Sequence, residues 1–409
     1  MPVRAAPPPP PWRRLIPDRP AADGGLPGWK TLGGHAPFTL EGGEIVGRSV
    51  AASKNSFLTT RETFGDFILE FDVKTDPRLN TGVMIRSESR PDYRDGVVHG
   101  YQVEIDPSDR RWTGGIYDEE RRLWLASPAH RPETQATFRP GGWNHLRVEA
   151  IGPRIRTWLN GKPAANLVDD LTARGFFGLQ VHDVGPDPAN EGMEVRFRDI
   201  RVITDDPARF ASPVDARDEQ DHIANHLTAE RHALGWRLLW NGTDKAGWVG
   251  WSPGGWWIDD GTIRRDATSA PLIATQGLAA FELEMDVAAE EEGAAGGILY
   301  LDGATYRLAQ GPAGQGMTAS GSMDGRIAAR NLTDPNPDKP AMKPVGHWNR
   351  VRICVTGDRI EHWLNGSLLV AEDRAALNLP ESGPIVLLPG QGAMRFRSIR
   401  ILPLEGGSR

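Results

Sequence analysis

The sequence predicts an all-β protein made of two tandem antiparallel β-sandwich domains. The stretch Trp143–Gly161 recurs without a gap as Trp348–Gly366, 205 positions later, with ten of nineteen residues identical. Each copy predicts two strands joined by a turn and ends in Asn-Gly, a pair that tolerates the positive φ of tight turns. Many further short strands are separated by Gly, Pro, Asp and Asn, with no alternation of strand and helix. These observations together indicate a duplicated antiparallel sandwich.

The individual strands are predicted by alternation of apolar and polar residues. Phe67–Val73 alternates over its whole length, which is typical of a half-buried strand, and Phe281–Val287 is its counterpart in the second copy. Arg196–Val202 is likewise echoed by Arg395–Ile401. The other strands predicted in the first copy are 81–86, 99–106, 143–150, 154–160 and 175–183, and the strand with Arg196–Val202 covers 193–203.

The repeats divide the chain into four predicted parts. Residues 1–11 form a proline-rich arm that we expect to be extended and without fixed structure. Residues 12–205 form the first sandwich, and residues 236–409 form the second. Between them, residues 206–235 are expected to be a linker with one short helix, because Ile223, Leu227 and Glu230 follow helical spacing within 219–232.

Composition excludes several classes of protein. The chain has 409 residues, 39% hydrophobic and 25% charged, and a net charge of -7, which argues against a nucleic-acid partner. No run approaches the roughly 20 apolar residues of a membrane span. The start of the chain lacks the apolar centre of a signal peptide, so the sequence leaves the compartment open. Cys354, the single cysteine, is expected to be a buried, inert thiol.

Three predicted strands turn polar side chains away from the core. In Tyr101–Asp106, Gly82–Arg86 and Gly178–His182, apolar residues alternate with polar ones, and residues two apart share a face. The polar set that this spacing places on the non-core face is Arg86, Gln102, Glu104, Asp106, Gln180 and His182. If the three strands are neighbours and this face is concave, these groups converge on a ligand.

Comparison with the second copy indicates that the fold does not require this polar set. Alignment of the repeats keeps the core positions apolar but replaces nearly all of the polar set. It places Leu301 opposite Arg86, Arg307 opposite Gln102, Ala309 opposite Glu104, Gly311 opposite Asp106, Leu388 opposite Gln180 and Gly390 opposite His182. Two copies under the same folding constraint keep what folding needs, so we interpret the polar set as functional in domain one and expect domain two to lack the chemistry.

The ordered motifs of the chain resemble the 3-keto-disaccharide hydrolase family, formerly a domain of unknown function. Domain one is covered almost completely, and domain two matches in its scaffold but departs from the motif at Gly383–Gly390. The motifs of domain one that carry the resemblance are Gly28-Trp29, Phe38–Val46, Gly65–Phe71, Thr81–Arg86, Gly100–Ile105, Thr113–Tyr117, Trp143-Asn144, Trp158–Gly161, Gly178–His182 and Phe197–Arg201.

The resemblance implies a concanavalin A-like jelly-roll fold and action on sugars oxidised at C3. A carbohydrate, either a 3-keto-glycoside or a disaccharide, is then the expected partner, and an extracytoplasmic or periplasmic location is the expected compartment. A ketone at C3 acidifies the hydrogen on C2, so a base can form an enolate that expels the C1 substituent. Water addition then completes a net hydrolysis. This route needs a base, an enolate stabiliser and a proton donor for the leaving group.

The polar set of domain one supplies candidates for each of these roles. His182 or Glu104 is the candidate base, Arg86 is the candidate oxyanion partner, and Tyr117 or Asp106 is the candidate proton donor. Substrate binding is assigned to Gln102, Gln180 and Tyr101. The cofactor prediction leaves open a divalent metal held by Glu104, Asp106 and His182, which would replace Arg86 as the electrophile.

Two other interpretations of the sequence remain open. This sandwich often serves lectins, so one alternative is a non-catalytic carbohydrate-binding or adhesion protein. Another is a conventional glycosidase in which Glu104 acts with a second carboxylate. Turnover of a 3-keto-glycoside distinguishes the enzyme from the binding module, and the sequence favours the enzyme.

Overall fold

The structure is a computed structural model that describes residues 9–252, 254–266, 270–310, 319–334 and 341–404. The chain divides into two compact units, Met1–Val214 and Asp215–Arg409, called domain one and domain two from here on. Within the described ranges, no helix has the length and apolar character that crossing a membrane requires.

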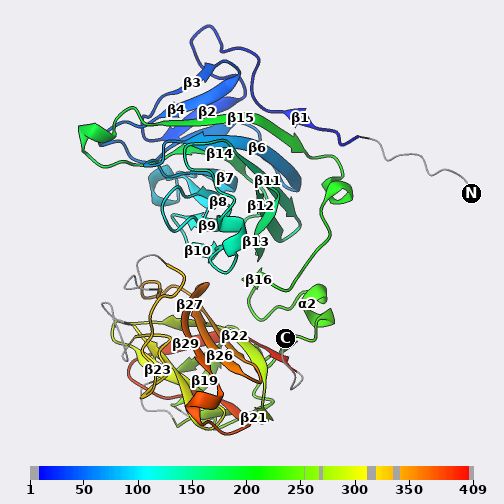
Figure 1. Ribbon diagram of the computed structural model, residues 1–409, viewed down its shortest axis with the longest axis vertical. Helices are drawn as coiled ribbons and strands as arrows, with labels where there is room; N and C mark the ends of the chain where they lie inside the picture. Colours follow the sequence, from blue (N-terminus) through cyan, green and yellow to red (C-terminus); the bar gives the residue numbers. More distant parts are fainter. Residues whose placement is uncertain (1–8, 253, 267–269, 311–318, 335–340, 405–409) are drawn as a thin grey trace, which may run out of the picture. The chain divides into compact units, whose positions relative to one another are not determined.

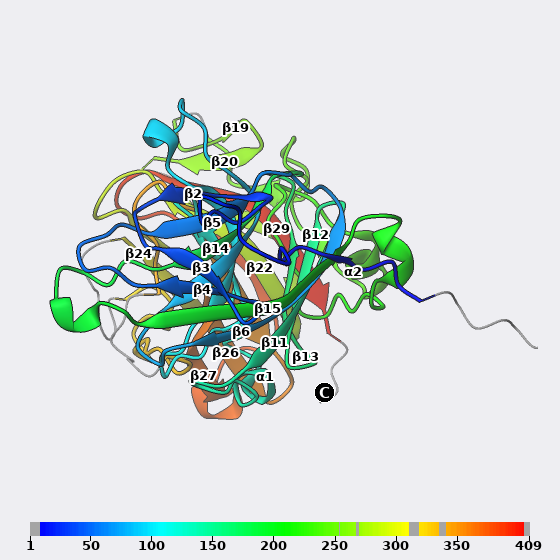
Figure 2. The same cartoon turned by 90° about the horizontal axis from the view of Figure 1, so that it is seen from above.

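Domain one contains two antiparallel sheets, sheet A and sheet B. Figure 2 shows several strands of sheet A following one another. Sheet A runs, in spatial order, through β13 (Lys162–Val168), β12 (Arg154–Leu159), β11 (Asn144–Ile151), β6 (Phe67–Thr75), β15 (Glu194–Ile203), β4 (Glu44–Arg48) and β3 (Phe38–Glu41), with β1 (Arg13–Arg14) beside β15.

Sheet B carries the strands that the sequence singles out for function. It runs through β10 (Leu123–Ala126), β9 (Ile116–Glu119), β8 (His99–Ile105), β7 (Thr81–Glu88), β14 (Phe176–Val181), β5 (Ser56–Thr60) and β2 (Trp29–Gly33). In Figure 1, β14, β7, β8, β9 and β10 are labelled in this order in domain one. The candidate strands are therefore direct neighbours.

The core of domain one lies between its two sheets. Phe67, Leu69 and Phe71 of β6 share one hydrophobic cluster with Val103 and Ile105 of β8, and each is at most 1% exposed. The side chains alternate as the sequence predicts, with the apolar face of each strand turned toward the other sheet. This packing confirms the antiparallel sandwich.

Domain two repeats the architecture with a smaller second sheet. Sheet C runs through β19 (Trp256–Asp259), β20 (Thr262–Arg265), β29 (Met394–Pro403), β22 (Phe281–Ala289), β25 (Asn349–Val355), β26 (Arg359–Leu364) and β27 (Ser367–Asp373), with β17 (Arg237–Leu238) beside β29. Sheet D runs through β18 (Trp248–Val249), β21 (Leu272–Leu278), β28 (Gly383–Leu388), β23 (Ala295–Tyr300) and β24 (Ala304–Ala309).

The duplication predicted from the sequence is visible in strand pairing. β22 lies between β25 and β29, as β6 lies between β11 and β15. Sheet D has five strands among the described residues, whereas sheet B has seven, so domain two lacks counterparts of β9 and β10 there. Cys354 in β25 is buried, as expected.

The remaining elements are short. They are β16 (Gln220–Asp221), the α-helices α1 (Pro132–Gln135) and α2 (Ala229–Ala233), and the 3-10 helices η1 (Arg94–Gly96), η2 (Pro188–Asn190), η3 (Pro207–Phe210) and η4 (Ala375–Leu377). The predicted short helix is α2, which begins late in the range 219–232 because the Thr228 hydroxyl caps it by accepting from the Arg231 backbone N–H at 3.2 Å.

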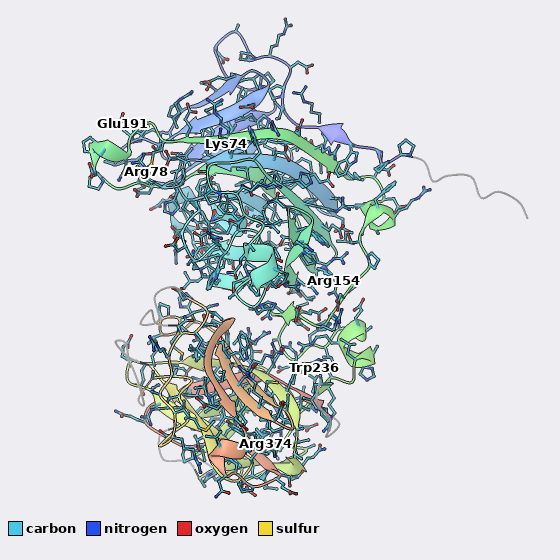
Figure 3. All side chains as sticks on the ribbon, in the orientation of Figure 1. Lys74, Arg78, Arg154, Glu191, Trp236 and Arg374 are labelled. Atoms are coloured by element: carbon cyan, nitrogen blue, oxygen red, sulfur yellow. The ribbon has the colours of Figure 1, made fainter. Side chains whose placement is uncertain are left out.

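The segment predicted as a linker is packed onto the two domains rather than free. Its first part belongs to domain one, where Glu149 accepts hydrogen bonds from the backbone and hydroxyl of Ser212. Its later part belongs to domain two, where buried Arg231 donates to Glu284 at 2.7 Å. The Arg231 guanidinium lies 3.7 Å from the ring centroid of Trp236. Trp236 is labelled in Figure 3. Removing the segment would expose buried charges in each domain.

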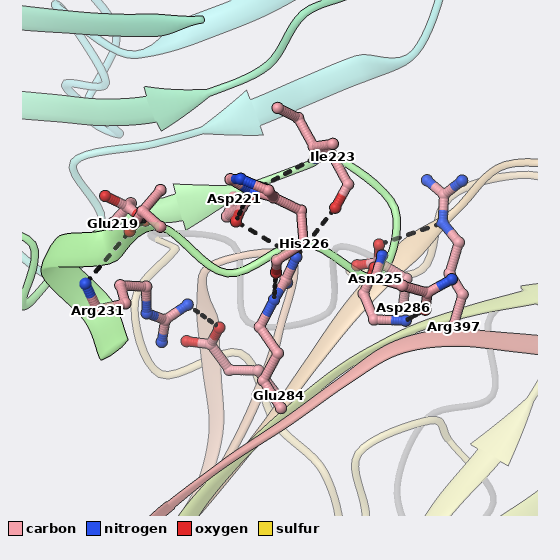
Figure 4. A network of polar contacts seen from close by, with 12 residues as sticks. Glu219, Asp221, Ile223, Asn225, His226, Arg231, Glu284, Asp286 and Arg397 are labelled. Carbon is pink, nitrogen blue, oxygen red and sulfur yellow. Dashed lines mark hydrogen bonds and ion pairs between the residues drawn. The ribbon is translucent and has the colours of Figure 1, made fainter. Parts of the chain in front are cut away.

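Figure 4 shows the polar network that holds this segment to domain two. Arg400 of β29 donates to the backbone carbonyls of His226 and Ile223, at 2.8 and 3.1 Å. Asp221, which is fully buried, lies 3.6 Å from Arg400 and 2.8 Å from the ring of His226. The segment before α2 is therefore irregular and tied down by charged side chains, not helical.

Candidate active site

Sheet B brings five polar side chains together on the face that points away from the core. The structure pairs Gln102 of β8 with Met84 of β7 and with Tyr117 of β9. Residues two apart on a strand share a face, so Glu104 lies beside Gln102 and Glu119 lies beside Tyr117. We call Gln102, Glu104, Tyr117, Glu119 and Gln180 the outer-face cluster.

Glu104 is a buried carboxyl group with few compensating contacts. It is 5% exposed, and Oε1 accepts a hydrogen bond of 2.7 Å from the Asn80 side chain. The Gln102 amide lies 3.4 Å from Oε2. Burial, together with the negative charge of Asp106, raises the pKa of Glu104 to about 7, although the Asn80 hydrogen bond acts in the opposite direction. The group is therefore poised to exchange a proton near neutral pH.

Glu119 at the end of β9 is a second carboxyl of the same kind. It is 7% exposed, and Oε1 accepts from the Asn55 side chain at 2.9 Å. Burial raises its pKa to about 7, with help from the charges of Glu120 and Asp118 and against the Asn55 hydrogen bond. Asn55 also accepts from the backbone N–H of Asp183 at 2.8 Å, which ties Glu119 to the segment that follows β14.

Tyr117 is electrostatically coupled to both carboxyl groups. Burial, and after it the charges of Glu119 and Glu104, raise the pKa of its hydroxyl to about 12. The side chain is half-buried, and the described part of the chain gives its hydroxyl no hydrogen-bond partner. A protonated phenol near two carboxyl groups can donate to a ligand oxygen.

Aromatic side chains of β9, β10 and the loop before β9 form an edge beside the two carboxyl groups. Trp124 is paired with Tyr117, and their rings meet edge to face with centroids 5.3 Å apart. Trp112 packs edge to face on Trp124 at 4.8 Å, and the Arg110 guanidinium lies 5.0 Å from the Trp124 centroid. A Cβ at Gly115 would lie 2.9 Å from the Trp124 ring, so only glycine fits there. Such rings can stack on the apolar faces of sugars.

The amides of Gln102 and Gln180 are buried without adequate partners. Gln102 is 2% exposed and Gln180 is 0% exposed. Within the described residues, Oε1 of Gln102 and both amide atoms of Gln180 form no hydrogen bond. A buried polar group without a partner costs about 1–3 kcal/mol. These atoms therefore mark a place where a polar ligand or water is expected.

Arg86 does not belong to the cluster, contrary to the sequence prediction. Its guanidinium donates to the carbonyls of Gly65 and Gly152 at 2.9 and 2.7 Å and pairs with Asp66 at 3.0 Å. The backbone of Arg86 has φ 44°, and the β7–β8 register shifts between Ile85 and Glu88. This β-bulge breaks the alternation of faces on which the prediction depended.

Asp106 and Tyr101 also lie where they cannot serve as the predicted proton donor and substrate-binding residue. Asp106 accepts from the backbone and hydroxyl of Ser108, from Arg110 and from the Trp112 backbone, so its oxygens shape the β8–β9 loop. Tyr101 lies in the core at 0% exposure, and its hydroxyl donates to Asp169. Neither side chain is available to a substrate in this arrangement.

His182 lies near the cluster but does not join it. It follows β14, is half-buried, and its Nδ1 lies 2.7 Å from the Asp183 carbonyl oxygen. The carboxylate neighbour expected for a catalytic histidine is not found among the described residues. These residues also contain no group of three His, Cys, Asp or Glu side chains arranged to hold a metal, so Glu104, Asp106 and His182 do not form the predicted set of ligands.

Domain two has other residues at the positions of the outer-face cluster. The structure shifts the alignment of β24 with β8 by two residues from the one that the sequence suggested. Gly297 pairs with both Arg307 and Leu388. Gly82, its counterpart, pairs with Glu104, so Arg307 occupies the place of Glu104 rather than that of Gln102. By the same register Thr305 replaces Gln102 and Ala309 replaces Asp106, whereas Leu388 replaces Gln180 as predicted. Gly311, aligned with Asp106 from the sequence, lies outside the described residues.

The sequence interpretation missed Glu119, Asn55 and Asn80. Glu119 follows Tyr117 by two residues, so the alternation that selected the other side chains also places it on the same face. Asn55 and Asn80 lie outside the strands, immediately before β5 and β7. No strand periodicity marks them, and only the fold brings them to the carboxyl groups.

Comparisons with known proteins find solved structures that are similar to part of the chain. A protein provisionally named a glycosyl hydrolase from Parabacteroides distasonis ATCC 8503 is 20% identical, covers 45% of this chain and 100% of its own, and has a TM-score of 0.38. A carbohydrate-binding module from Bacillus subtilis is 22% identical, covers 42% and 93%, and has a TM-score of 0.30. No curated protein matches the chain. The family model of the 3-keto-alpha-glucoside-1,2-lyase-like domain matches residues 12–203 and 235–402, so the chain belongs to this family.

Proposed function

We propose that domain one cleaves the glycosidic bond of 3-keto-glycosides by elimination, followed by addition of water. The observation that carries the proposal is the pair of buried carboxyl groups, Glu104 and Glu119, each with a pKa raised to about 7. Elimination needs one ionised carboxylate as base and one neutral carboxylic acid as proton donor, and such a pair supplies both near neutral pH. Membership of the 3-keto-alpha-glucoside-1,2-lyase-like family supports the same reaction.

Glu104, Glu119 and Tyr117 each have a task in this reaction. Glu104 removes the proton from C2, and the C–H electrons form an enolate on the C3 ketone. The enolate then re-forms the ketone as a C1–C2 double bond is made and the C1–O bond breaks. The leaving oxygen takes a proton from Glu119, with Tyr117 as a hydrogen-bond donor beside it. Water adds to C1 of the resulting unsaturated ketone, and a proton returns to C2.

The groups that the reaction needs lie on four strands of sheet B. The amides of Gln102 and Gln180 lie on β8 and β14, Glu104 lies on β8, Tyr117 and Glu119 lie on β9, and Trp124 lies on β10. Glu119 pairs with Gly100, four residues before Glu104 on β8, so Glu104 and Glu119 lie on opposite sides of the Gln102–Tyr117 pair. A substrate placed over Tyr117 would meet the base on one side and the acid on the other.

The test is release of 4-nitrophenol from 4-nitrophenyl 3-keto-α-glucoside by the full chain, against an enzyme-free blank. We expect turnover of this compound and none of the parent glucoside. Because the base must be ionised and the acid must be neutral, and burial raises the pKa of each carboxyl group to about 7, kcat/KM should follow a bell-shaped pH profile with its maximum near pH 7. Loss of activity at low pH reports protonation of the base, and loss at high pH reports ionisation of the acid.

Two outcomes of this assay oppose the proposal. Release from the parent glucoside, without preference for the ketone, would favour a conventional glycosidase, for which Glu119 now supplies the second carboxyl group. Binding of the 3-keto compound without release would favour a carbohydrate-binding module built on the Trp124 edge. Domain two, with Arg307 and Leu388 in place of Glu104 and Gln180, is proposed to act as a scaffold, lid or binding module without chemistry of its own.

A further inference from the structure

We propose that the amides of Gln102 and Gln180 bind the ketone oxygen and stabilise the enolate that forms from it. This assignment deepens the proposed function and rests on it. It transfers the role that the sequence suggested for Arg86 to neutral N–H donors. Arg86 has its guanidinium committed to Gly65, Gly152 and Asp66, so it has no donor directed at the outer-face cluster.

The first line of evidence is burial of both amides without adequate hydrogen bonds. Gln180 is fully buried, and neither of its amide atoms has a partner among the described residues. The Gln102 N–H group makes one long contact of 3.4 Å to Glu104, so Gln180 supplies the donor that has no other partner there. Folded proteins pair nearly all such groups. The Gln102 side chain lies directly over Gly82, where an added Cβ would be 2.5 Å from its Cδ. Glycine thus leaves the room that the Gln102 amide occupies.

The second line of evidence is the internal copy. By strand register, Leu388 takes the place of Gln180 and Thr305 takes the place of Gln102 in domain two. The same fold therefore forms with leucine at this position, and folding does not require the Gln180 amide. Keeping an unpaired buried amide in domain one lowers stability, and a function that needs the amide explains why it is kept.

The chemistry follows from where charge develops in the reaction. When Glu104 takes the C2 proton, the electron pair moves into a C2–C3 double bond and the ketone π electrons move onto the oxygen. An N–H donor binds this oxyanion more strongly than the neutral ketone, so it lowers the barrier rather than tightening ground-state binding. The loss on removing the donor should therefore appear mainly in kcat.

The test uses the 3-keto derivative of 1,5-anhydroglucitol, which has no leaving group at C1. In D₂O, exchange of its C2 hydrogen, followed by NMR, reports enolate formation alone. We expect Gln180→Leu in the full chain to slow enzyme-catalysed exchange by about 10²–10³-fold, the usual cost of one oxyanion donor, with a smaller change in KM. The melting temperature of domain one should stay unchanged or rise, by about 2–4 °C for each kcal/mol gained.

A slower exchange rate together with an unchanged or higher melting temperature distinguishes a role in the reaction from a role in folding. Gln180→Met serves as a second variant of similar length. Gln391→Leu, at an exposed position in domain two, is the matched control that should change neither quantity. Exchange as fast as in the parent protein, a change in KM alone, or a joint fall in exchange and melting temperature would overturn the assignment. If the parent protein neither exchanges C2 nor releases 4-nitrophenol, the proposed function itself fails.

Discussion

Glu104→Gln is expected to lower turnover of a 3-keto-glycoside by about 10²–10⁴-fold, because the amide cannot take the C2 proton. The substitution keeps the shape of the side chain and removes a carboxyl group whose burial raises its pKa to about 7. The free energy of unfolding at neutral pH should not fall, because burying the charged form of the Glu104 carboxyl group already costs the folded state free energy that a neutral amide does not. Steady-state release of 4-nitrophenol and a thermal melt, measured on the same preparation, give both results.

The matched control for this variant is Glu120→Gln. Glu120 follows Glu119 directly but is exposed, and it pairs with Arg94 at 2.8 Å. We expect this change to leave turnover at neutral pH within a few-fold of that of the parent protein, with only a downward shift of the Glu119 pKa, which the Glu120 charge helps to raise. If Glu104→Gln were as active as Glu120→Gln, the base would have to be another group, and His182 would be the next candidate because it lies just beyond β14.

Arg231→Met is expected to destabilise domain two by about 3–5 kcal/mol, the usual cost of leaving one partner of a buried ion pair without the other. Burial by itself would raise the pKa of Glu284, but the Arg231 guanidinium beside it lowers that pKa to about 2. Without Arg231, the buried carboxylate either takes up a proton or remains poorly compensated. The methionine also loses the contact with Trp236. Calorimetric unfolding of the full chain should show the domain-two transition at a lower temperature.

Two further variants test the cause of this loss. The double change Arg231→Met with Glu284→Leu removes both charges and should recover much of the stability. Arg264→Met, which breaks a more exposed pair with Glu290, should cost no more than about 1 kcal/mol. Equal losses for Arg231→Met and Arg264→Met would mean that the buried pair between α2 and Glu284 contributes no more to domain two than an exposed pair does.

The sandwich fold could be predicted from the sequence because its signals are local and repeated. Alternation over Phe67–Val73 predicts β6, and the structure extends that strand only to Thr75. The duplicated hairpin likewise predicts β11 and β12. The docking of the segment before α2 could not be predicted, because it depends on charged side chains such as Arg400 that reach backbone carbonyls far away in the sequence.

The candidate site was partly predictable for the same reason. Glu104, Gln102 and Gln180 follow the alternation within regular strands, and the structure turns them to one face. Arg86 does not, because a β-bulge with positive φ has no signature in the alternation of residues. The raised pKa of Glu104 was not predictable, since it depends on burial by segments distant in sequence.

The most direct test of elimination is to cleave a 3-keto-glucoside with the full chain in D₂O and examine C2 of the sugar product by NMR at early times. Elimination followed by addition of water must remove the original C2 hydrogen, so the account predicts deuterium at C2 of every product molecule. An enzyme-free sample of the product measures background exchange. A released sugar that keeps its C2 hydrogen would show direct hydrolysis and would contradict the central claim.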